Sequence, residues 1–148
     1  HSFCPSISEV QYQFYNEEIA LANAIGVGIQ PFDKEVFYQR TSVLGQEYMG
    51  EGCDVPFDEE WEVGYGTGPF TIQNRYVTED VPVGCHVYHE LGKKFGVPTP
   101  IIDSMIVLGG VMNKTDYFES GLKLEDLGIG HMDKEALLAY LNEGVYTE

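Results

Sequence analysis

Helical periodicity in residues 80–95 constrains the fold more than any other feature of the sequence. The apolar residues of this stretch recur every four positions, which places them on one face of a helix. They are Val83, Val87, Leu91 and Phe95. The polar residues of the opposite face are His86, Glu90 and Lys93. Thr78 or Asp80 can cap this helix and Gly96 can end it, so both ends carry the expected signals.

Other segments repeat the same helical signature. Residues 6–25 begin with a capping-box pattern, Ser6 to Glu9, and stop at Gly26. Further helices are predicted at residues 31–45, 116–120 and 133–142, whereas residues 49–69 are rich in glycine and acidic residues and predict a long surface loop. No strand pattern of comparable strength is present. The sequence therefore predicts an all-α bundle of about five to seven helices.

Residues 98–112 form the most apolar predicted helix. Thr99 can cap it, and Pro100 suits the first helical position. Its apolar residues cover nearly the whole circumference, so we expect this helix to be central and buried.

Length and charge limit the class of protein. The chain has 148 residues, which predicts one domain, 1–148, and no apolar run is long enough to cross a bilayer. A net charge of −16 disfavours nucleic acid and anionic lipid surfaces as partners. Three widely spaced cysteines, Cys4, Cys53 and Cys85, and no signal-like start favour a cytoplasmic location. Because the chain starts at His1 and enters a helix almost at once, we expect it to be part of a longer protein.

Several motif-like clusters have simpler explanations. The glycines of residues 64–68 follow no predicted strand and precede no phosphate-binding helix, so a loop explains them better than a nucleotide site. The acidic run at 58–62 lacks the alternating oxygen ligands of a calcium loop. Cys85, His86 and His89 lie close together on one helix, but their spacing does not fit a zinc site. We therefore predict no metal, and a metal-binding helix pair stays only as the weakest alternative.

Arg75 and Asp80 lie just before or at the start of the predicted 80–95 helix. The planar guanidinium of an arginine can hold a carboxylate at two points, and it stays charged at any working pH. An aspartate at the helix start could orient a histidine and stabilise its protonated form. The alternative is a surface pair of Arg75 with Glu79 or Asp80, worth about 0 to 1 kcal/mol. Composition by itself favours the surface pair.

Five short segments carry a more specific pattern. They are CPSI at 4–7, AIGV at 24–27, RYVTEDVP at 75–82, LG at 91–92 and GVPTPIID at 96–103. In order and spacing they resemble the C-terminal helical domain of the octopine/nopaline (opine) dehydrogenase family. The resemblance covers most of residues 3–112, and it shifts the interpretation of Arg75 from a surface pair to a substrate contact.

The resemblance implies a fold like the C-terminal domain of 6-phosphogluconate dehydrogenase. Family members join the amino group of an amino acid to the carbonyl of an α-keto acid and reduce the imine with NADH or NADPH. By resemblance, Arg75 contacts a substrate carboxylate. By the same resemblance, Asp80 supports a catalytic histidine that acts as acid or base.

Two parts of the family pattern are missing from this sequence. No predicted strand is followed by a G-x-G-x-x-G turn, so the N-terminal Rossmann domain that binds the dinucleotide is expected outside this chain. The family's catalytic histidine lies upstream, and neither His86 nor His89 is its equivalent. We therefore expect the chain to be inactive by itself. The alternative from another class is a non-catalytic helical module that forms a homodimer through residues 98–112.

Overall fold

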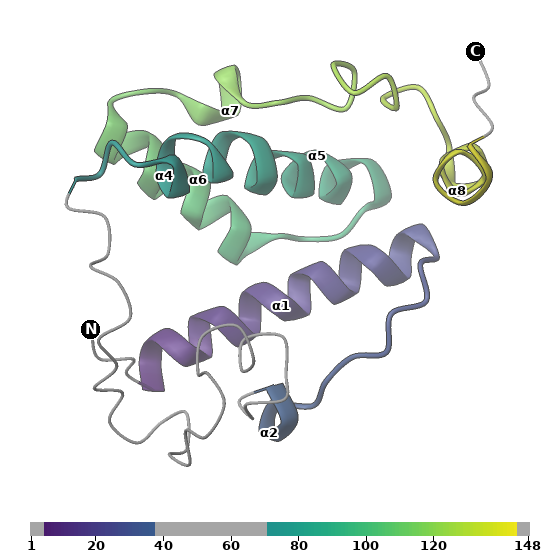
Figure 1. The fold of residues 1–148 in the computed structure, drawn as a ribbon, viewed down its shortest axis with the longest axis horizontal. Coiled ribbons are helices and arrows are strands. Elements are labelled where there is room, and N and C mark those ends of the chain that lie inside the picture. Colours follow the sequence, from purple (N-terminus) through teal and green to yellow (C-terminus); the bar gives the residue numbers. More distant parts are fainter. Residues whose placement is uncertain (1–4, 38–70, 145–148) are drawn as a thin grey trace. The chain divides into compact units, whose positions relative to one another are not determined.

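The computed structural model describes residues 5–37 and 71–144, and their regular structure is entirely helical (Figure 1). The elements are α1 (Pro5–Ile25), α2 (Lys34–Phe37), α4 (Arg75–Thr78), the π-helix η1 (Val81–Cys85), α5 (His86–Phe95), α6 (Pro100–Asn113), α7 (Tyr117–Ser120) and α8 (Lys134–Glu143). These residues contain no strand, which confirms the all-α prediction. The loop predicted at 49–69 and the predicted helix end near Gly45 lie outside the described residues.

Most predicted helix ends are confirmed. Gly26 and Gly96 follow α1 and α5 with φ of +95° and +71°, a left-handed conformation that suits glycine. Asp116 and Asp133 cap α7 and α8 with their side chains. The capping box at Ser6 is wrong, because α1 begins at Pro5 and Ser6 therefore lies inside the first turn.

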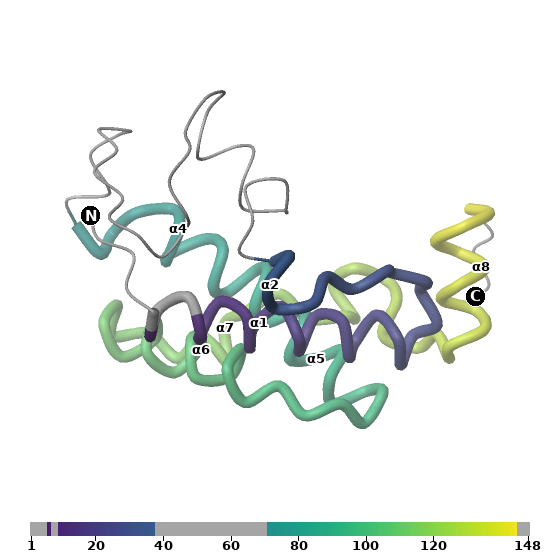
Figure 2. Tube along the Cα trace, turned by 90° about the horizontal axis from the view of Figure 1, so that it is seen from below, coloured from purple at the N-terminus to yellow at the C-terminus, as the bar shows by residue number. Residues whose placement is uncertain are grey.

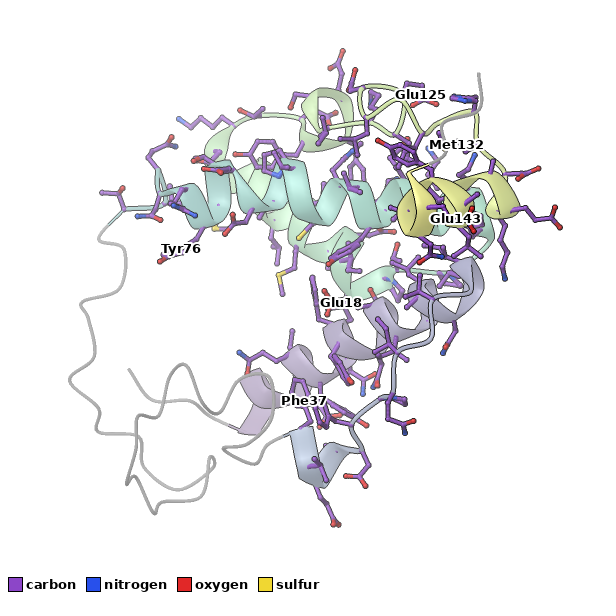
Figure 3. The ribbon with its side chains drawn as sticks, turned by 45° about the vertical axis from the view of Figure 1, so that its right-hand side comes forward. Glu18, Phe37, Tyr76, Glu125, Met132 and Glu143 are labelled. Atoms are coloured by element: carbon purple, nitrogen blue, oxygen red, sulfur yellow. The ribbon has the colours of Figure 1, made fainter. Side chains whose placement is uncertain are left out.

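The described residues belong to two compact units, residues 1–15 with 30–70 and residues 16–29 with 71–148. In the first unit, an aromatic cluster joins the beginning of α1 to α2. The Tyr15 ring stacks on Phe37 at 4.9 Å between centroids, and Tyr12 packs against the same ring at 5.3 Å. Phe37 is buried as a result, and it is labelled in Figure 3. Aromatic burial of this kind supplies much of the packing energy of a small unit.

The second unit contains α4 to α8 and the end of α1. Helices α5 and α6 contact each other, and α8 runs across the direction of α5 (Figure 2). Ile25, Met132 and Leu137 form a buried cluster against which Leu91 and Phe95 of α5 pack. Met132 lies beside α8 in Figure 3. The predicted apolar face of α5 is thus confirmed at its C-terminal half, whereas Val83 is 44% exposed.

The prediction that residues 98–112 form a helix buried on all sides is wrong in part. Ile102 and Ile106 are fully buried on one face of α6. The opposite face is exposed, and its residues are Val107, Leu108, Val111 and Met112. A helix that is apolar on all sides is fully buried only when neighbouring elements pack on every side. The described residues of this unit pack on one side of α6.

The N-terminus of α6 is held by a residue from α1. The buried carboxylate of Glu17 accepts hydrogen bonds from the amides of Ile101 and Ile102, at 2.8 and 3.0 Å. Thr99 does not cap the helix through its side chain, contrary to the prediction; its hydroxyl donates to Asp103 at 3.0 Å instead. A carboxylate at this position satisfies unpaired amides and opposes the positive end of the helix dipole.

No helix among the described residues combines the length and the apolar character needed to cross a membrane.

Candidate functional site

The predicted site residues lie in and beside a single turn of helix, α4. Asn74 caps this turn, because its side chain accepts from the amide of Tyr76 at 3.2 Å. Arg75 is the first residue of α4, a separate helical turn that the sequence did not predict. Asparagine is among the favoured capping residues, so the sequence contained this signal.

The two residues proposed as caps of the next helix do not cap it. Thr78 donates its hydroxyl to the carbonyl of Asn74 at 3.1 Å, within α4. Asp80 has helical backbone angles and makes no side-chain capping bond. The chain continues from Asp80 into η1, which contains Pro82, and then directly into α5. Proline lacks an amide hydrogen and is tolerated in a first turn.

The side chain of Arg75 lies at the surface of the described part of the chain. Arg75 is exposed, and its side chain forms no hydrogen bond or ion pair with a described residue. Neither Glu79 nor Asp80 pairs with it, so the surface-pair alternative is not found in this structure. An exposed, unpaired guanidinium can accept a carboxylate without first breaking an internal salt bridge.

Asp80 is exposed and lies near the thiol of Cys85. Burial, and after it the charges of Asp80 and Glu18, raise the pKa of Cys85 to about 11. The thiol therefore stays protonated at neutral pH and is not a nucleophile. Asp80 has no histidine partner among the described residues, so no structural contact yet assigns it a catalytic role.

Glu18 and Tyr88 extend this group of ionisable side chains. Burial raises the pKa of Glu18, and a hydrogen bond from Tyr88 lowers it in part. Burial and the charge of Glu18 raise the pKa of Tyr88 to about 12. Glu18 comes from α1, whereas Cys85 and Tyr88 come from the continuous segment of η1 and α5, so sequence spacing could not have brought them together. Glu18 is labelled in Figure 3.

Both histidines of α5 contact other groups of the protein. His86 is 1% exposed, contrary to its predicted place on the polar face, and both ring nitrogens face backbone carbonyls. His89 contacts the carboxylate of Asp103 at 2.8 Å. Within residues 5–37 and 71–144, no three His, Cys, Asp or Glu side chains are arranged to hold a metal ion.

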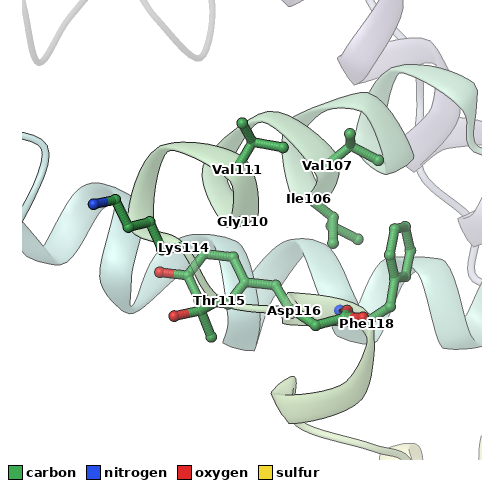
Figure 4. Close-up of a pocket in the computed structure, with 9 residues that line it drawn as sticks. Ile106, Val107, Gly110, Val111, Lys114, Thr115, Asp116 and Phe118 are labelled. Atoms are coloured by element: carbon green, nitrogen blue, oxygen red, sulfur yellow. Dashed lines mark hydrogen bonds between the residues drawn. The ribbon is translucent and has the colours of Figure 1, made fainter.

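An open cleft of about 400 Å³ lies between the C-terminal half of α6 and the start of α7 (Figure 4). Ile106, Val107, Val111 and Phe118 make its apolar lining, and Lys114 and Asp116 add charge. Lys114 ends α6 with φ of 55° and, like Arg75, forms no ion pair with a described residue. Gln73, two residues before Arg75, hydrogen-bonds Asn113, so the chain around α4 is tied to this end of α6.

The described residues contain no Rossmann-type dinucleotide motif. Binding the pyrophosphate of NAD or NADP in a Rossmann fold needs a strand, a glycine turn and a helix in succession. The described part of the chain has no strand and no such turn before a helix.

Comparison with known proteins identifies the family. The sequence model of the NAD/NADP octopine/nopaline dehydrogenase α-helical domain matches residues 1–113, a range that includes Arg75 and Asp80. The chain is also similar to the opine dehydrogenase of Arthrobacter sp. (strain 1C), with 28% identity over 128 residues. That match covers 84% of this chain and 33% of the relative, so the chain spans about a third of the relative's length. The chain therefore belongs to the octopine/nopaline dehydrogenase family, within the part of it that forms the α-helical domain.

Proposed function

We propose that residues 1–148 are the substrate domain of an NAD(P)-dependent opine dehydrogenase-like enzyme. The enzyme would join the amino group of an amino acid to an α-keto acid and reduce the product, acting on a CH–NH bond. NAD(P)H, bound by an N-terminal Rossmann domain outside these residues, would supply the hydride. We propose a cytoplasmic location, and we expect this chain to be inactive by itself.

Arg75 carries this proposal. Both substrates have carboxylates, and Arg75 is an exposed arginine in the family-matched range with no ion pair to a described residue. In a chain of net charge −16, a cation with no ion pair to a described residue can hold an organic acid against the general repulsion. A two-point guanidinium–carboxylate contact would also fix the orientation of the substrate.

Asp80 would act on a histidine supplied from outside this chain. Its carboxylate is exposed, lies at the junction of α4 and η1, and makes no capping bond that would occupy it. A carboxylate bonded to an imidazole fixes which nitrogen carries the proton and stabilises the charged form. The histidine could then give a proton to the keto-acid oxygen during condensation or take one from the amine.

The test is an assay of NAD(P)H oxidation with an amino acid and an α-keto acid together. The full-length protein should oxidise the dinucleotide only when both substrates are present, whereas the 148-residue chain should show no turnover. Oxidation with the keto acid alone would indicate a simple keto-acid reductase. Turnover by the short chain would contradict the assignment of the nucleotide site to another domain.

The exposed apolar face of α6 favours a second function, a dimerisation module. Val111 is 72% exposed and Leu108 is 56% exposed, and both belong to the most apolar of the described helices. Solvent-exposed apolar clusters of this kind often mark protein interfaces. Under this alternative, light scattering should show a dimer for the unmodified protein and a monomer for Val111→Asp. The full-length protein should show no dehydrogenase activity.

A further inference from the structure

Most basic side chains in the described part of the chain already contact another group of the protein. Four of them contact a carboxylate or a backbone carbonyl; these are Lys34, Lys93, Lys94 and Lys123. The side chains of Arg75, Lys114 and Lys134 form no hydrogen bond or ion pair with a described residue. Lys134 lies in the first turn of α8, whereas Lys114 lines the cleft between α6 and α7. Lys114 is therefore a second cation, after Arg75, that a bound acid could use.

We propose that Lys114 is a second carboxylate-binding residue of the substrate site, and that Arg75 and Lys114 each hold one of the two acids. This inference rests on the proposed function, because the amino acid and the keto acid each bring a carboxylate and their condensation product keeps both. A lysine ammonium binds a carboxylate as a compact point charge with three donors. Lys114 would position the acid and take no part in proton or hydride transfer.

A hydrogen bond between Gln73 and Asn113 holds the two cations near each other. The side-chain amide of Gln73 donates to the side-chain oxygen of Asn113, whose own amide group donates to the carbonyl of Gly109 at 3.2 Å. Gln73 precedes Arg75 by two residues and Asn113 directly precedes Lys114, and α4 contacts α6. Because consecutive Cα atoms lie only about 3.8 Å apart, each cation begins close to this bond. Two such long side chains would then be within reach of one product molecule with two carboxylates.

The backbone of Lys114 has a conformation that usually favours glycine. Its φ and ψ are 55° and 38°, and the other residues with positive φ in the described ranges are glycines. The turn is fixed, because the amides of Lys114 and Thr115 both donate to the carbonyl of Gly110. A positive charge at a helix C-terminus is favourable and gives a structural reason for a lysine here. A strained residue whose side chain has no internal partner is also the pattern expected of a ligand-binding group.

The cleft provides an apolar surface beside this ammonium. Figure 4 shows Lys114 at one end of the lining residues and Phe118 with Ile106 at the other. An acid bound to Lys114 could lay its hydrocarbon part against this surface. Asp116 is the acidic residue of the lining, and its Oδ1 accepts from the amides of Phe118 and Glu119 at 2.9 and 3.1 Å. Those amides hold part of its charge, which reduces its repulsion of a second carboxylate.

Kinetics of the full-length protein test the division between the two cations. Lys114→Gln removes the charge and should raise KM for one substrate about tenfold, a factor at the low end for a charged hydrogen bond. Lys114→Arg should keep most of the affinity, and the matched control Lys134→Gln should keep all of it. Arg75→Ala should raise KM chiefly for the other substrate. Wild-type KM values in Lys114→Gln, or an effect of both variants on the same substrate, would overturn the proposal.

Lys114→Gly separates substrate binding from a structural role. This variant also loses the charge, but glycine suits the left-handed backbone at this position. We expect it to unfold at a higher urea concentration than the wild type and still to show the raised KM. A stability that falls together with the affinity would assign Lys114 to the structure of the helix end and would contradict the proposal.

Calorimetric binding of simple acids to the full-length protein gives a readout without turnover. Iminodiacetate carries two carboxylates on one amine, as the condensation product does, whereas N-methylglycine carries one. In the wild type, we expect Kd for iminodiacetate to be about tenfold lower than Kd for N-methylglycine, and we expect Lys114→Gln to remove this difference. Equal Kd values in the wild type would contradict the role of Lys114. A wild-type protein that does not oxidise NAD(P)H with both substrates would instead contradict the proposed function.

Discussion

Glu17 and Ile102 are joined by a buried hydrogen bond of 3.0 Å between a carboxylate on α1 and an amide at the start of α6. The other carboxylate oxygen accepts from the preceding amide, so one side chain satisfies two unpaired donors. Glu17→Ala should lower the free energy of unfolding by about 2 to 3 kcal/mol, because charged hydrogen bonds are lost and two buried amides lose their partners. Urea unfolding of the chain measures this change.

The matched variants separate this role from general charge effects. Glu17→Gln keeps one acceptor oxygen and should lose about half as much stability. Glu143→Gln removes a carboxylate at the exposed end of α8 and should leave the urea midpoint unchanged. Equal effects of Glu17→Ala and Glu143→Gln would show that the buried capping contact does not stabilise α6.

Alkaline pH should destabilise the second unit through Cys85 and Tyr88. Their pKa values are raised from 9.0 to about 11 and from 10.0 to about 12. A group whose folded pKa is raised contributes stability below its unfolded pKa, and this stability is lost as pH rises through the folded value. The free energy of unfolding should therefore fall between pH 9.0 and about 12. Alkylation of Cys85 should reach half its maximal rate near pH 11, against about pH 9 in the urea-unfolded chain.

Mass spectrometry of the Cys85 peptide gives that rate directly. If the folded and unfolded chains are alkylated with the same pH dependence, burial does not control this thiol. In the Cys85→Ser variant, we expect the free energy of unfolding to fall less steeply with pH in the alkaline range. An unchanged slope in this variant would contradict the role of Cys85.

Lys114 should be replaceable by glycine with a gain in stability. Its φ of 55° lies in the left-handed region, which costs an ordinary residue about 1 kcal/mol relative to glycine. Lys114→Gly should therefore raise the free energy of unfolding by about 1 kcal/mol, because this position ends α6 as a glycine usually does. Lys93→Gly, in the last turn of α5 but still inside the helix, should instead lower it. Thermal unfolding of both variants compares the two positions, and a loss of stability in Lys114→Gly would contradict the backbone argument.

Helix α8 should depend on its capping residue. The carboxylate of Asp133 accepts from the amide of Ala136 at 2.9 Å. Asp133→Ala should cost about 1 kcal/mol, whereas Asp133→Asn, which keeps the acceptor, should cost little. Circular dichroism during urea unfolding distinguishes them. Equal losses in the two variants would indicate that the charge, and not the capping bond, matters here.

Local signals predicted the helices well. Pro100, Gly96 and Asp133 each lie at the helix boundary that their chemistry favours, because capping and left-handed backbone depend on adjacent residues. The family resemblance rested on equally local segments, and the match over residues 1–113 confirms it. Assignment of roles to Arg75 and Asp80 was also possible from the sequence, although only as predictions that no contact in this chain tests.

Long-range contacts were not predictable. His86 fell on the polar face of its helix, yet α7 and Leu122 cover it because Gly121 lets their backbone approach. The sequence did not distinguish Glu17 from the other glutamates, because its contact with the start of α6 joins residues far apart in the chain. Conversely, the apolar face with Val111 was predicted to be buried, and no periodicity could tell which face lacks a neighbour. Each error concerns a contact between residues far apart in the sequence.

The central claim is that the guanidinium of Arg75 binds a substrate carboxylate, and steady-state kinetics of the full-length protein test it most directly. Arg75→Ala should lower kcat/KM for the carboxylate substrate about 100-fold, because a two-point charged contact is lost. Its urea midpoint should not change, since Arg75 is exposed and makes no internal ion pair in the described residues. Lys93→Ala, which removes an exposed cation on α5, should keep the wild-type kcat/KM. A kcat/KM for Arg75→Ala equal to that of Lys93→Ala would contradict the account.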